Sequence, residues 1–491
     1  MSGTDLPEVL DAASLTEHED CDVVVVGFGI AGGCAALEAA RSGARVVLLE
    51  RSAVHGGTSA MSGGAFYLGG GTPVQEATGH PDSVEAMVDY LTAVSREPDA
   101  AKIRAYCEES VEHFTWLEAL GFSFERSFHD KKAVIQPGTE GLMYTGNEKV
   151  HPFVDQAAPA PRGHKVPVAG DTEGTRLVMD LLRDRLADEG VDVRYETGAN
   201  ALVTSGSNGE GAGDVVGVRW RRFTETGLIR TRSVVLAAGG FVMNKDMVAK
   251  FTPNLAEKPF VLGTTYDDGL GIRLGESVGA ATAFMEEAFI TAPFYPPSRL
   301  VTGIVVNKEG RRFVAEDSYH SRTSAFVMDQ PDHAAYLIVD SAHIEHPAFP
   351  LAPFIDGWET VEEMETALGL PVGSLTATLA AYNENAARGE DPDFHKQPEW
   401  LEPQDTGPWG AFDLTLGTAL YAGFTMGGLV TDVDGRVLRE GGAPITGLYA
   451  AGACASNIAQ DAKGYASGTQ LGEGSYFGRR AGRHAAQPVP S

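Results

Sequence analysis

The chain has 491 residues, which at roughly 150 residues per domain suggests about three domains. Its 38 basic and 67 acidic residues give a net charge of −29, which disfavours binding to the phosphate backbone of a nucleic acid. Hydrophobic residues make up 43% of the chain, enough for a sizeable core. Glycine accounts for 59 residues, about 12% against a typical value near 7%, and this excess predicts many tight turns and close backbone approaches to a bound molecule.

The cysteines and the N-terminal region point to a reduced, cytoplasmic setting. No CxxC spacing occurs among the four cysteines, so we expect neither a disulfide framework nor a metal site: Cys21, Cys34, Cys107 and Cys454. The acidic first twenty residues lack the basic and apolar regions of a signal peptide. The sequence has no run of about 18 apolar residues, so we expect no transmembrane segment. Loose association with a membrane surface stays open.

The first strong pattern is a strand, a helix and a second strand. An apolar run over Asp22–Val26 is followed by helical spacing over Ala31–Ser42 and by a second apolar run over Arg45–Glu50. Short, fully apolar runs are typical of parallel strands that are buried on both faces. The order predicts a βαβ unit at the start of an α/β fold.

The turn inside this unit carries a dinucleotide-binding pattern, Gly27-Phe-Gly29-Ile-Ala-Gly32. The first glycine allows a tight turn, the second lets the backbone approach a pyrophosphate, and the third permits close packing of helix and strand. The helix N-terminus offers unpaired N–H groups to the phosphates. Glu50, 18 residues after Gly32, ends the second strand, where a carboxylate can accept hydrogen bonds from ribose hydroxyls.

The rest of the first half continues the alternation of helices and strands. We expect helices over Ser83–Ser95 and Asp99–Leu120, a long functional loop over Gly138–Gly170, and a buried strand over Val234–Gly240 that ends in glycines. The pattern changes between residues 279 and 416, where proline and scattered aromatic residues become more frequent. It returns with a strand over Leu448–Gly452 and a terminal helix over Leu471–Ala486.

The simplest architecture is therefore one Rossmann-like α/β domain split in sequence by an insert. We place the split domain at residues 1–278 and 417–491 and an α+β insert at residues 279–416. Aromatic residues of the insert, such as Phe289, are as consistent with an ordinary core as with a flat apolar pocket.

The segment His55-Gly-Gly-Thr-Ser-Ala-Met-Ser-Gly-Gly64 follows Glu50 closely. With Thr265–Gly269, Ile304–Phe313, Thr425–Gly428 and Gly447–Gly452, it resembles the fumarate reductase/succinate dehydrogenase flavoprotein superfamily almost end to end. The resemblance implies that the split domain binds FAD and that the insert is a substrate or capping domain. It places the FAD contacts at Gly27, Gly29, Ile30, Ala31, Gly32, Glu50, Arg51, Gly57, Thr58, Ser59, Ser62, Gly63, Gly64, Ala201, Gly239, Asp268, Gly452, Ala453, Gly468 and Leu471.

The FAD is expected to be non-covalent. Succinate dehydrogenases of this superfamily attach FAD through a histidine six residues before a Gly-Gly pair, and Gly57 stands at that position here. His55 is two residues away, and we expect it to be an ordinary loop histidine.

The resemblance does not extend to the residues that bind dicarboxylates. Superfamily members that act on fumarate carry a histidine and two arginines at the positions of Gly423, His320 and Gln470. Without these cations a dicarboxylate would leave unpaired charge in a buried site, at a cost of several kcal/mol. We therefore expect a neutral substrate, whose oriented binding depends on hydroxyl groups in apolar surroundings.

Two segments supply such hydroxyls, Tyr319 and the run Gly464-Tyr465-Ala-Ser467-Gly468. Here the chain resembles the 3-ketosteroid dehydrogenase branch of the superfamily. Members that act at C1–C2 carry a YAGPG-like segment, and Ser467 stands where they have proline. This departure is what the Δ4-(5α) type, which desaturates C4–C5, shows.

The resemblance implies that Tyr465 binds the C3 oxygen of a neutral steroid, that Ser467 takes the C4 proton, and that Tyr319 relays that proton. The C5 hydride would pass to flavin N5 and the electrons to an unidentified acceptor. Three alternatives stay open: a Δ1-dehydrogenase, an ene-reductase of another neutral unsaturated carbonyl compound, and an FAD-binding protein without turnover. The sequence does not define the steroid side-chain preference or the oligomeric state.

Overall fold

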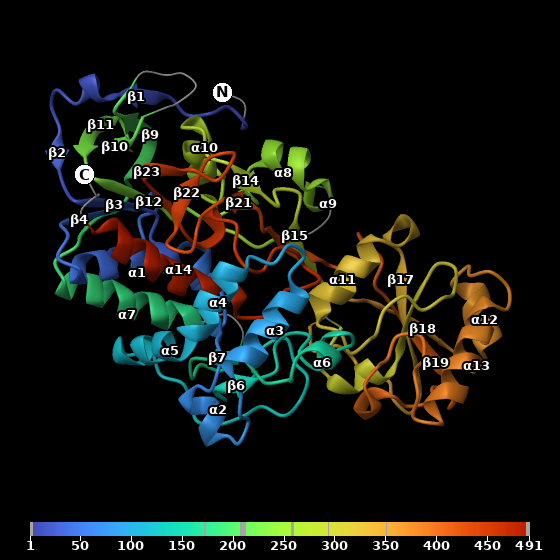
Figure 1. Cartoon of the computed structure of the whole chain (residues 1–491). Coiled ribbons are helices and arrows are strands. Elements are labelled where there is room, and N and C mark those ends of the chain that lie inside the picture. The colour runs from blue at the N-terminus through green and yellow to red at the C-terminus, as the bar shows by residue number, and fades with distance from the viewer. Residues whose placement is uncertain are drawn as a thin grey trace.

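The structure is a computed structural model that describes residues 3–170, 173–206, 213–256, 260–292, 294–349 and 351–487. These residues form a larger part, which contains the first and last described elements, and a smaller part beside it (Figure 1). The first element is β1 (Val9–Asp11) and the last is α14 (Thr469–Ala485). Among the described residues, no helix is long and apolar enough to cross a membrane.

The larger part is built on a six-stranded sheet in the order β22-β23-β12-β3-β4-β8. All neighbouring strands are parallel except β22, which runs antiparallel to β23. Because both faces are covered, β3 consists of four fully buried valines. The expected α/β fold is confirmed, with strands at Val23–Val26 (β3), Val46–Leu49 (β4), Asp192–Arg194 (β8), Ser233–Leu236 (β12), Arg436–Leu438 (β22) and Pro444–Ala450 (β23).

Helices α1 (Ile30–Arg41), α7 (Gly174–Asp188) and α14 lie together below this sheet in the view of Figure 1. Helices α1 and α14 pack with their backbones very close. A Cβ atom added at Gly478 would lie 2.3 Å from the Ala31 carbonyl oxygen, and one at Gly482 would lie 2.0 Å from that of Ala35. Some of the glycine excess therefore serves helix packing.

A second, five-stranded sheet in the order β1-β9-β10-β11-β2 also belongs to the larger part. The helical stretch predicted over Asp99–Leu120 is two helices that meet at Glu109, and the loop predicted over Gly138–Gly170 contains short elements. The remaining elements of this region are β2 (Glu19–Asp20), β5 (Ala65–Tyr67), α2 (Pro73–Ala77), α3 (Val84–Val94), α4 (Ala100–Glu108), α5 (Ser110–Ala119), β6 (Leu142–Met143), α6 (Phe153–Gln156), β7 (Gly163–Lys165), β9 (Gly198–Thr204), β10 (Val215–Arg222), β11 (Glu225–Arg230), α8 (Lys245–Phe251), α9 (Pro253–Ala256) and α10 (Leu270–Ser277).

The smaller part has its own antiparallel sheet, in the order β16-β17-β19-β18, and its own apolar core around Ile304, Ile338 and Leu375. Its elements are β16 (Ile304–Asn307), α11 (His320–Met328), β17 (Ala335–Asp340), β18 (Phe354–Trp358), α12 (Val361–Ala367), α13 (Ser374–Ala386) and β19 (Trp409–Asp413).

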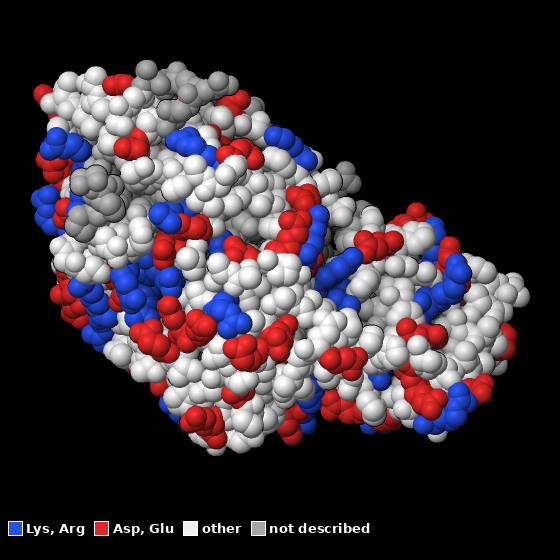
Figure 2. Space-filling model, viewed as in Figure 1, with Lys and Arg blue, Asp and Glu red and all other residues white. Residues whose placement is uncertain are grey.

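Five further short strands form two small sheets, β13-β20-β15 and β14-β21. They are β13 (Phe260–Val261), β14 (Thr282–Ala283), β15 (Ala288–Thr291), β20 (Ala422–Thr425) and β21 (Gly428–Leu429). Strand β15, inside the predicted insert, pairs antiparallel with β20 of the split domain. On the face shown in Figure 2, basic side chains lie among acidic ones rather than forming a continuous basic surface.

Candidate active site

A cavity of about 780 Å³ is lined by residues of both parts. Its lining includes the turn between β3 and α1, together with Glu50, and also the three hydroxyl side chains singled out above, Tyr319, Tyr465 and Ser467. We call Phe289, Thr291, Tyr319, His320, Phe424, Tyr465 and Ser467 the hydroxyl region of this cavity.

The β3–α1 turn requires its glycines. Gly27 has a φ of +101°, and a Cβ atom there would lie 2.4 Å from the Ala237 carbonyl oxygen. A Cβ atom at Gly32 would lie 1.9 Å from the carbonyl oxygen of Gly27. The turn therefore brings the N-terminus of α1 to the cavity, where its N–H groups can meet an anionic group.

Glu50 is a buried carboxylate at the end of β4. Its two oxygens accept hydrogen bonds from the backbone N–H groups of Phe28 and Ser52, both at 2.7 Å. Burial raises the pKa of Glu50. These bonds tie Glu50 to the β3–α1 turn and orient its carboxylate beside the cavity.

The segment after Glu50 is hydrogen-bonded to the same turn. Ser59 Oγ accepts the Ile30 backbone N–H at 3.1 Å, and the Thr58 hydroxyl donates to Asp267. Ser62 and Thr175 share a hydrogen bond of 2.6 Å between their hydroxyls. His55 lies 2.9 Å from an Asp180 oxygen, so its ring is held by a carboxylate rather than by backbone.

Most of the predicted cofactor residues line the cavity: Gly27, Gly29, Ile30, Ala31, Glu50, Arg51, Gly57, Thr58, Ser59, Ser62, Gly63, Gly239, Gly452, Ala453, Gly468 and Leu471. Gly32, Gly64, Ala201 and Asp268 are not among the lining residues. Ala201 is buried in β9, which presents Gly198 and Ala199 to the cavity instead. Asp268 accepts a hydrogen bond from Arg51 at 2.9 Å and so acts behind the lining.

Sequence reasoning missed Asp267, the neighbour of Asp268. Asp267 lines the cavity and accepts the Thr264 backbone N–H at 2.8 Å, and burial raises its pKa. The sequence shows the Asp267-Asp268 pair, but it does not show which of the two side chains faces the cavity. Val134 and Ile135, which also line it, carry no chemical signal in the sequence.

Tyr319 and Ser467 are in direct contact. Their hydroxyl oxygens lie 2.5 Å apart, and the Ser467 hydroxyl also donates to the Val134 carbonyl oxygen at 2.8 Å. Because a serine hydroxyl has one hydrogen, Ser467 then accepts the Tyr319 hydrogen. Burial raises the pKa of Tyr319 well above its usual value, so this side chain keeps its proton at neutral pH.

Tyr465 is held among aromatic rings. Its ring lies 4.7 Å from that of Phe289 and 5.8 Å from that of Phe424, both edge to face, and those two phenylalanines stack at 4.6 Å. Phe289 is thus part of the pocket and not only core. Burial raises the pKa of Tyr465, and the Gln470 backbone N–H, in the first turn of α14, opposes this rise.

Ser467 is placed by its own backbone. Its N–H donates to the Thr145 carbonyl oxygen and its carbonyl accepts the Thr145 hydroxyl, both at 2.9 Å. Gly468 follows with a φ of +95° and caps α14. A Cβ atom there would lie 2.8 Å from the Tyr67 nitrogen, so only glycine fits.

A buried network of charged residues holds the chain just before Tyr319. Arg312 forms two-pronged ion pairs with Glu316 and Asp391, with N–O distances of 2.7 to 3.0 Å, and Lys396 lies 3.4 Å from Glu316. Burial opposes ionisation of Glu316, yet the Arg312 and Lys396 cations hold its pKa below the usual range. Tyr319 follows Glu316 closely and begins α11 as its N-cap residue.

Among the described residues that line the cavity none is a lysine, and the two arginines, Arg51 and Arg176, lie outside the hydroxyl region. His320, at the position of a superfamily arginine, is 2% exposed and bonded to Thr291. Burial lowers its pKa to about 3, so the ring is neutral. This arrangement can hold an uncharged ligand.

A family model for the FAD binding domain matches residues 22–471. The chain belongs to this family. FAD is therefore its cofactor, and the glycine turn, the α1 N-terminus and Glu50 fit a dinucleotide. Non-covalent attachment stays a prediction.

Individual relatives are also similar to the chain. The structure of 3-ketosteroid-Δ4-(5α)-dehydrogenase from Rhodococcus jostii RHA1, in complex with 4-androstene-3,17-dione, is 40% identical over 99% of this chain and 100% of that one, with a TM-score of 0.91. A vinyl phenol reductase of Lactiplantibacillus plantarum is 28% identical over 96% of this chain and 98% of its own. A 3-oxo-5-alpha-steroid 4-dehydrogenase of Comamonas testosteroni is 28% identical over 91% and 95%.

Proposed function

We propose that the protein is an FAD-dependent dehydrogenase that desaturates a 3-ketosteroid between C4 and C5. The observation that carries this proposal is the contact between the Tyr319 and Ser467 hydroxyls, 2.5 Å apart, beside Tyr465 in a cavity that also includes the cofactor residues. Support comes from the 40% identity to a 3-ketosteroid-Δ4-(5α)-dehydrogenase across nearly the whole chain.

Tyr465 is assigned to the steroid C3 oxygen. Its buried phenol remains protonated and can donate a hydrogen bond to that oxygen as negative charge develops there. The stacked rings of Phe289 and Phe424 offer an apolar face beside it. A C–H bond next to a polarised carbonyl becomes acidic, which is what removal of the C4 proton needs.

Ser467 is assigned to accept the C4 proton. A serine is a weak base unless a partner takes its own hydrogen. As the C4 proton binds Ser467 Oγ, the Ser467 hydrogen turns from the Val134 carbonyl oxygen to the Tyr319 hydroxyl oxygen. The Tyr319 hydrogen then leaves to a water molecule in the cavity, which Tyr319 also lines. FAD, when bound, supplies the acceptor for the C5 hydride.

We also propose where in the cell the protein acts and how its flavin is reoxidised. The four cysteines are free and buried thiols, as is usual in reducing compartments, which supports a cytoplasmic location. The acceptor that reoxidises the flavin is a separate partner, and the rate of flavin reoxidation with each candidate oxidant would identify it.

The test is flavin bleaching under anaerobic conditions. The holoenzyme is mixed with 5α-androstane-3,17-dione, and we expect rapid loss of the oxidised flavin spectrum. Tyr465→Phe should slow this reduction by about 10²- to 10³-fold, as for loss of an oxyanion donor. Tyr421→Phe, which removes a buried hydroxyl bonded to the Leu414 carbonyl outside the cavity lining, is the matched control and should react at the wild-type rate.

Two results would contradict the proposal. Reduced enzyme that is reoxidised by a vinyl phenol or another neutral unsaturated compound, with no bleaching by saturated ketosteroids, would indicate an ene-reductase. A flavin that no candidate substrate bleaches or reoxidises would indicate a binding protein without turnover.

A further inference from the structure

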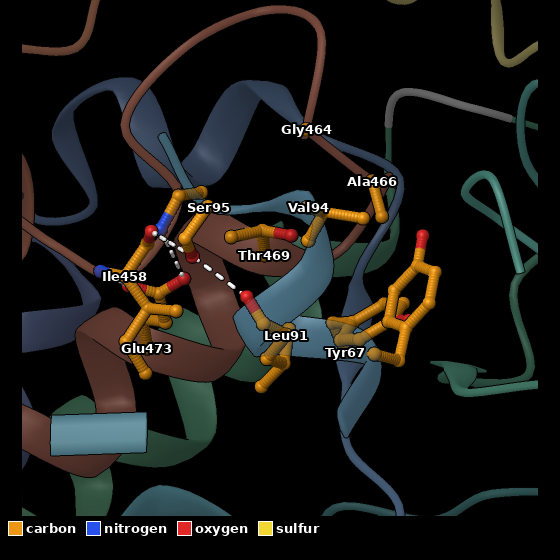
Figure 3. Close-up of a pocket in the computed structure, with 11 residues that line it drawn as sticks. Tyr67, Leu91, Val94, Ser95, Ile458, Gly464, Ala466, Thr469 and Glu473 are labelled. Carbon is orange, nitrogen blue, oxygen red and sulfur yellow. Dashed lines mark hydrogen bonds between the residues drawn. The ribbon is translucent and has the colours of Figure 1, made fainter. Parts of the chain in front are cut away.

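Glu473 is a buried carboxylate that the proposed reaction does not use. It projects from α14, is 2% exposed, and lines a cavity of only about 10 Å³, close to the lower limit for one water molecule. Figure 3 shows its side chain next to Ile458, below Ser95. A buried carboxylate with so little room for water needs hydrogen-bond donors from the protein.

The donors come from the chain segment that carries Tyr465 and Ser467. The Ile458 backbone N–H donates to one carboxylate oxygen at 2.7 Å, and the Ala459 backbone N–H donates to the other at 3.2 Å. Glu473 is thus the point at which α14 holds the start of residues 456–468, which we call the 456–468 segment.

The contact reaches the hydroxyl region through Ala459. The Ala459 side chain packs against the cluster formed by Phe289, Tyr319, Met426 and Tyr465. A shift of the Ala459 backbone would therefore move the aromatic side chains that hold the two proposed catalytic tyrosines.

We propose that Glu473 is a positioning residue whose ionised carboxylate fixes the 456–468 segment, and with it the hydroxyls of Tyr465 and Ser467. The inference rests on the proposed function. Only the ionised form has two acceptor oxygens, because protonation converts one of them into a donor that faces an N–H group. Loss of either bond would loosen the segment and misplace the reacting groups, which typically costs up to about 10²-fold in rate.

The charge state of Glu473 depends on the groups that face it. Burial raises its pKa to about 7, and Lys102 of α4 opposes this rise. The Lys102 ammonium donates to Thr431 Oγ1 at 3.0 Å and to the Ser456 carbonyl at 2.9 Å. The other titratable groups that line the same small cavity or interact with the carboxylate are the hydroxyls of Tyr67, Tyr90, Tyr106 and Tyr465.

The experiment measures the single-turnover rate of flavin reduction by 5α-androstane-3,17-dione in the holoenzyme as a function of pH. In the wild type we expect the rate to fall on the acid side with an apparent pKa near 7. In Glu473→Gln the rate should be about 10- to 100-fold lower at alkaline pH and should lack this acid limb. A limb that persists in Glu473→Gln, or a wild-type rate in that variant, would overturn the proposal.

Two further variants keep the proposal falsifiable if Glu473→Gln does not fold. Lys102→Met removes the cation that lowers the Glu473 pKa, so the acid limb should move to higher pH. Gln460→Met is the matched control, because Gln460 holds the same segment through two bonds to the Glu97 backbone, at 2.7 and 2.8 Å, but does not titrate. The Gln460→Met variant should keep the acid limb of the pH profile at the wild-type position.

An unmoved limb in Lys102→Met, or a wild-type profile without a limb, would refute the role of Glu473. Both results differ from failure of the proposed function, in which the wild type does not react with the steroid at any pH.

Discussion

At the residue scale, the site replaces charge with hydroxyl groups. Gly423, Gln470 and the neutral His320 stand where superfamily enzymes that bind dicarboxylates carry cations, whereas Tyr319 and Ser467 form a direct hydrogen bond. The sequence was enough to single out three hydroxyl side chains that the fold brings into one cavity, Tyr319, Tyr465 and Ser467. It did not reveal the Val134 carbonyl as a partner of Ser467, because a backbone acceptor has no residue type.

Replacing Ser467 tests its role as the proton acceptor. Ser467→Ala removes the oxygen that receives the C4 proton, so flavin reduction by a 5α-3-ketosteroid should slow by about 10²- to 10⁴-fold. Stopped-flow absorbance measures this rate. Ser475→Ala, which removes a buried serine hydroxyl of α14 that does not line the cavity, should react normally. Turnover near the wild-type level in Ser467→Ala would remove the residue as the base.

Glu473 should also affect stability in a pH-dependent way. Its folded-state pKa of about 7 lies above the ordinary 4.5, so its contribution to stability is fully present below 4.5 and is lost as the pH rises through 7. The loss amounts to about 3 kcal/mol at 1.36 kcal/mol per pH unit. Relative to the wild type, Glu473→Gln should therefore gain stability between about pH 4.5 and about pH 7, measured as the difference in Tm. A difference that is constant with pH would contradict this.

At the element scale, the β3–α1 turn was predictable and the support of Tyr319 was not. Strand, glycine turn and helix are contiguous in sequence, so local rules were sufficient. Tyr319 depends on Asp391 and Lys396, which follow α13 and reach Glu316 and Arg312 only through the tertiary fold. The periodicity also predicted a single helix where α4 and α5 are separate. The break is slight, because Glu109 at the junction keeps helical dihedral angles.

A methyl group at Gly32 should disrupt the turn. In Gly32→Ala the new Cβ atom would meet the Gly27 carbonyl oxygen at 1.9 Å, so the backbone must shift, at a cost of about 1–3 kcal/mol or more. The purified variant should contain less FAD per chain, measured by absorbance. Gly357→Ala, where the nearest atom is 3.7 Å away, is the control. Full FAD content in Gly32→Ala would show that the turn is less constrained than the structure indicates.

The buried charge network should be sensitive to loss of one partner. Glu316→Gln leaves Arg312 and Lys396 with reduced compensation and should lower the free energy of unfolding by about 3–5 kcal/mol. Glu384→Gln removes an ion pair to Arg388 whose glutamate is 75% exposed, and should change it by less than about 1 kcal/mol. Chemical denaturation measures both. Equal effects would mean that the network does not hold the segment before α11.

At the scale of the whole molecule, the cavity exists because distant segments meet. Tyr319 and Ser467 are 148 residues apart, and Val134 lies more than 300 residues from Ser467. An apolar pair such as Val134-Ile135 carries no chemical signal in the sequence, and Phe289 was as consistent with core as with pocket. The boundaries 1–278, 279–416 and 417–491 stay predictions. Strand β15 of the second range pairs with β20 of the third.

Whether FAD is attached covalently or non-covalently is tested on the whole protein. Gly57 stands where a covalent attachment would need histidine, and the His55 ring is bonded to Asp180. Acid precipitation should release all of the flavin into the supernatant. Flavin that remains with the precipitated protein would show covalent attachment.

The most direct test of the central claim is the identity of the product. The holoenzyme is incubated with 5α-androstane-3,17-dione and an artificial electron acceptor, and the product is identified by mass and ultraviolet spectrum. Desaturation between C4 and C5 predicts 4-androstene-3,17-dione, the ligand named for the Rhodococcus relative. A 1-ene product, or unchanged steroid, would contradict it.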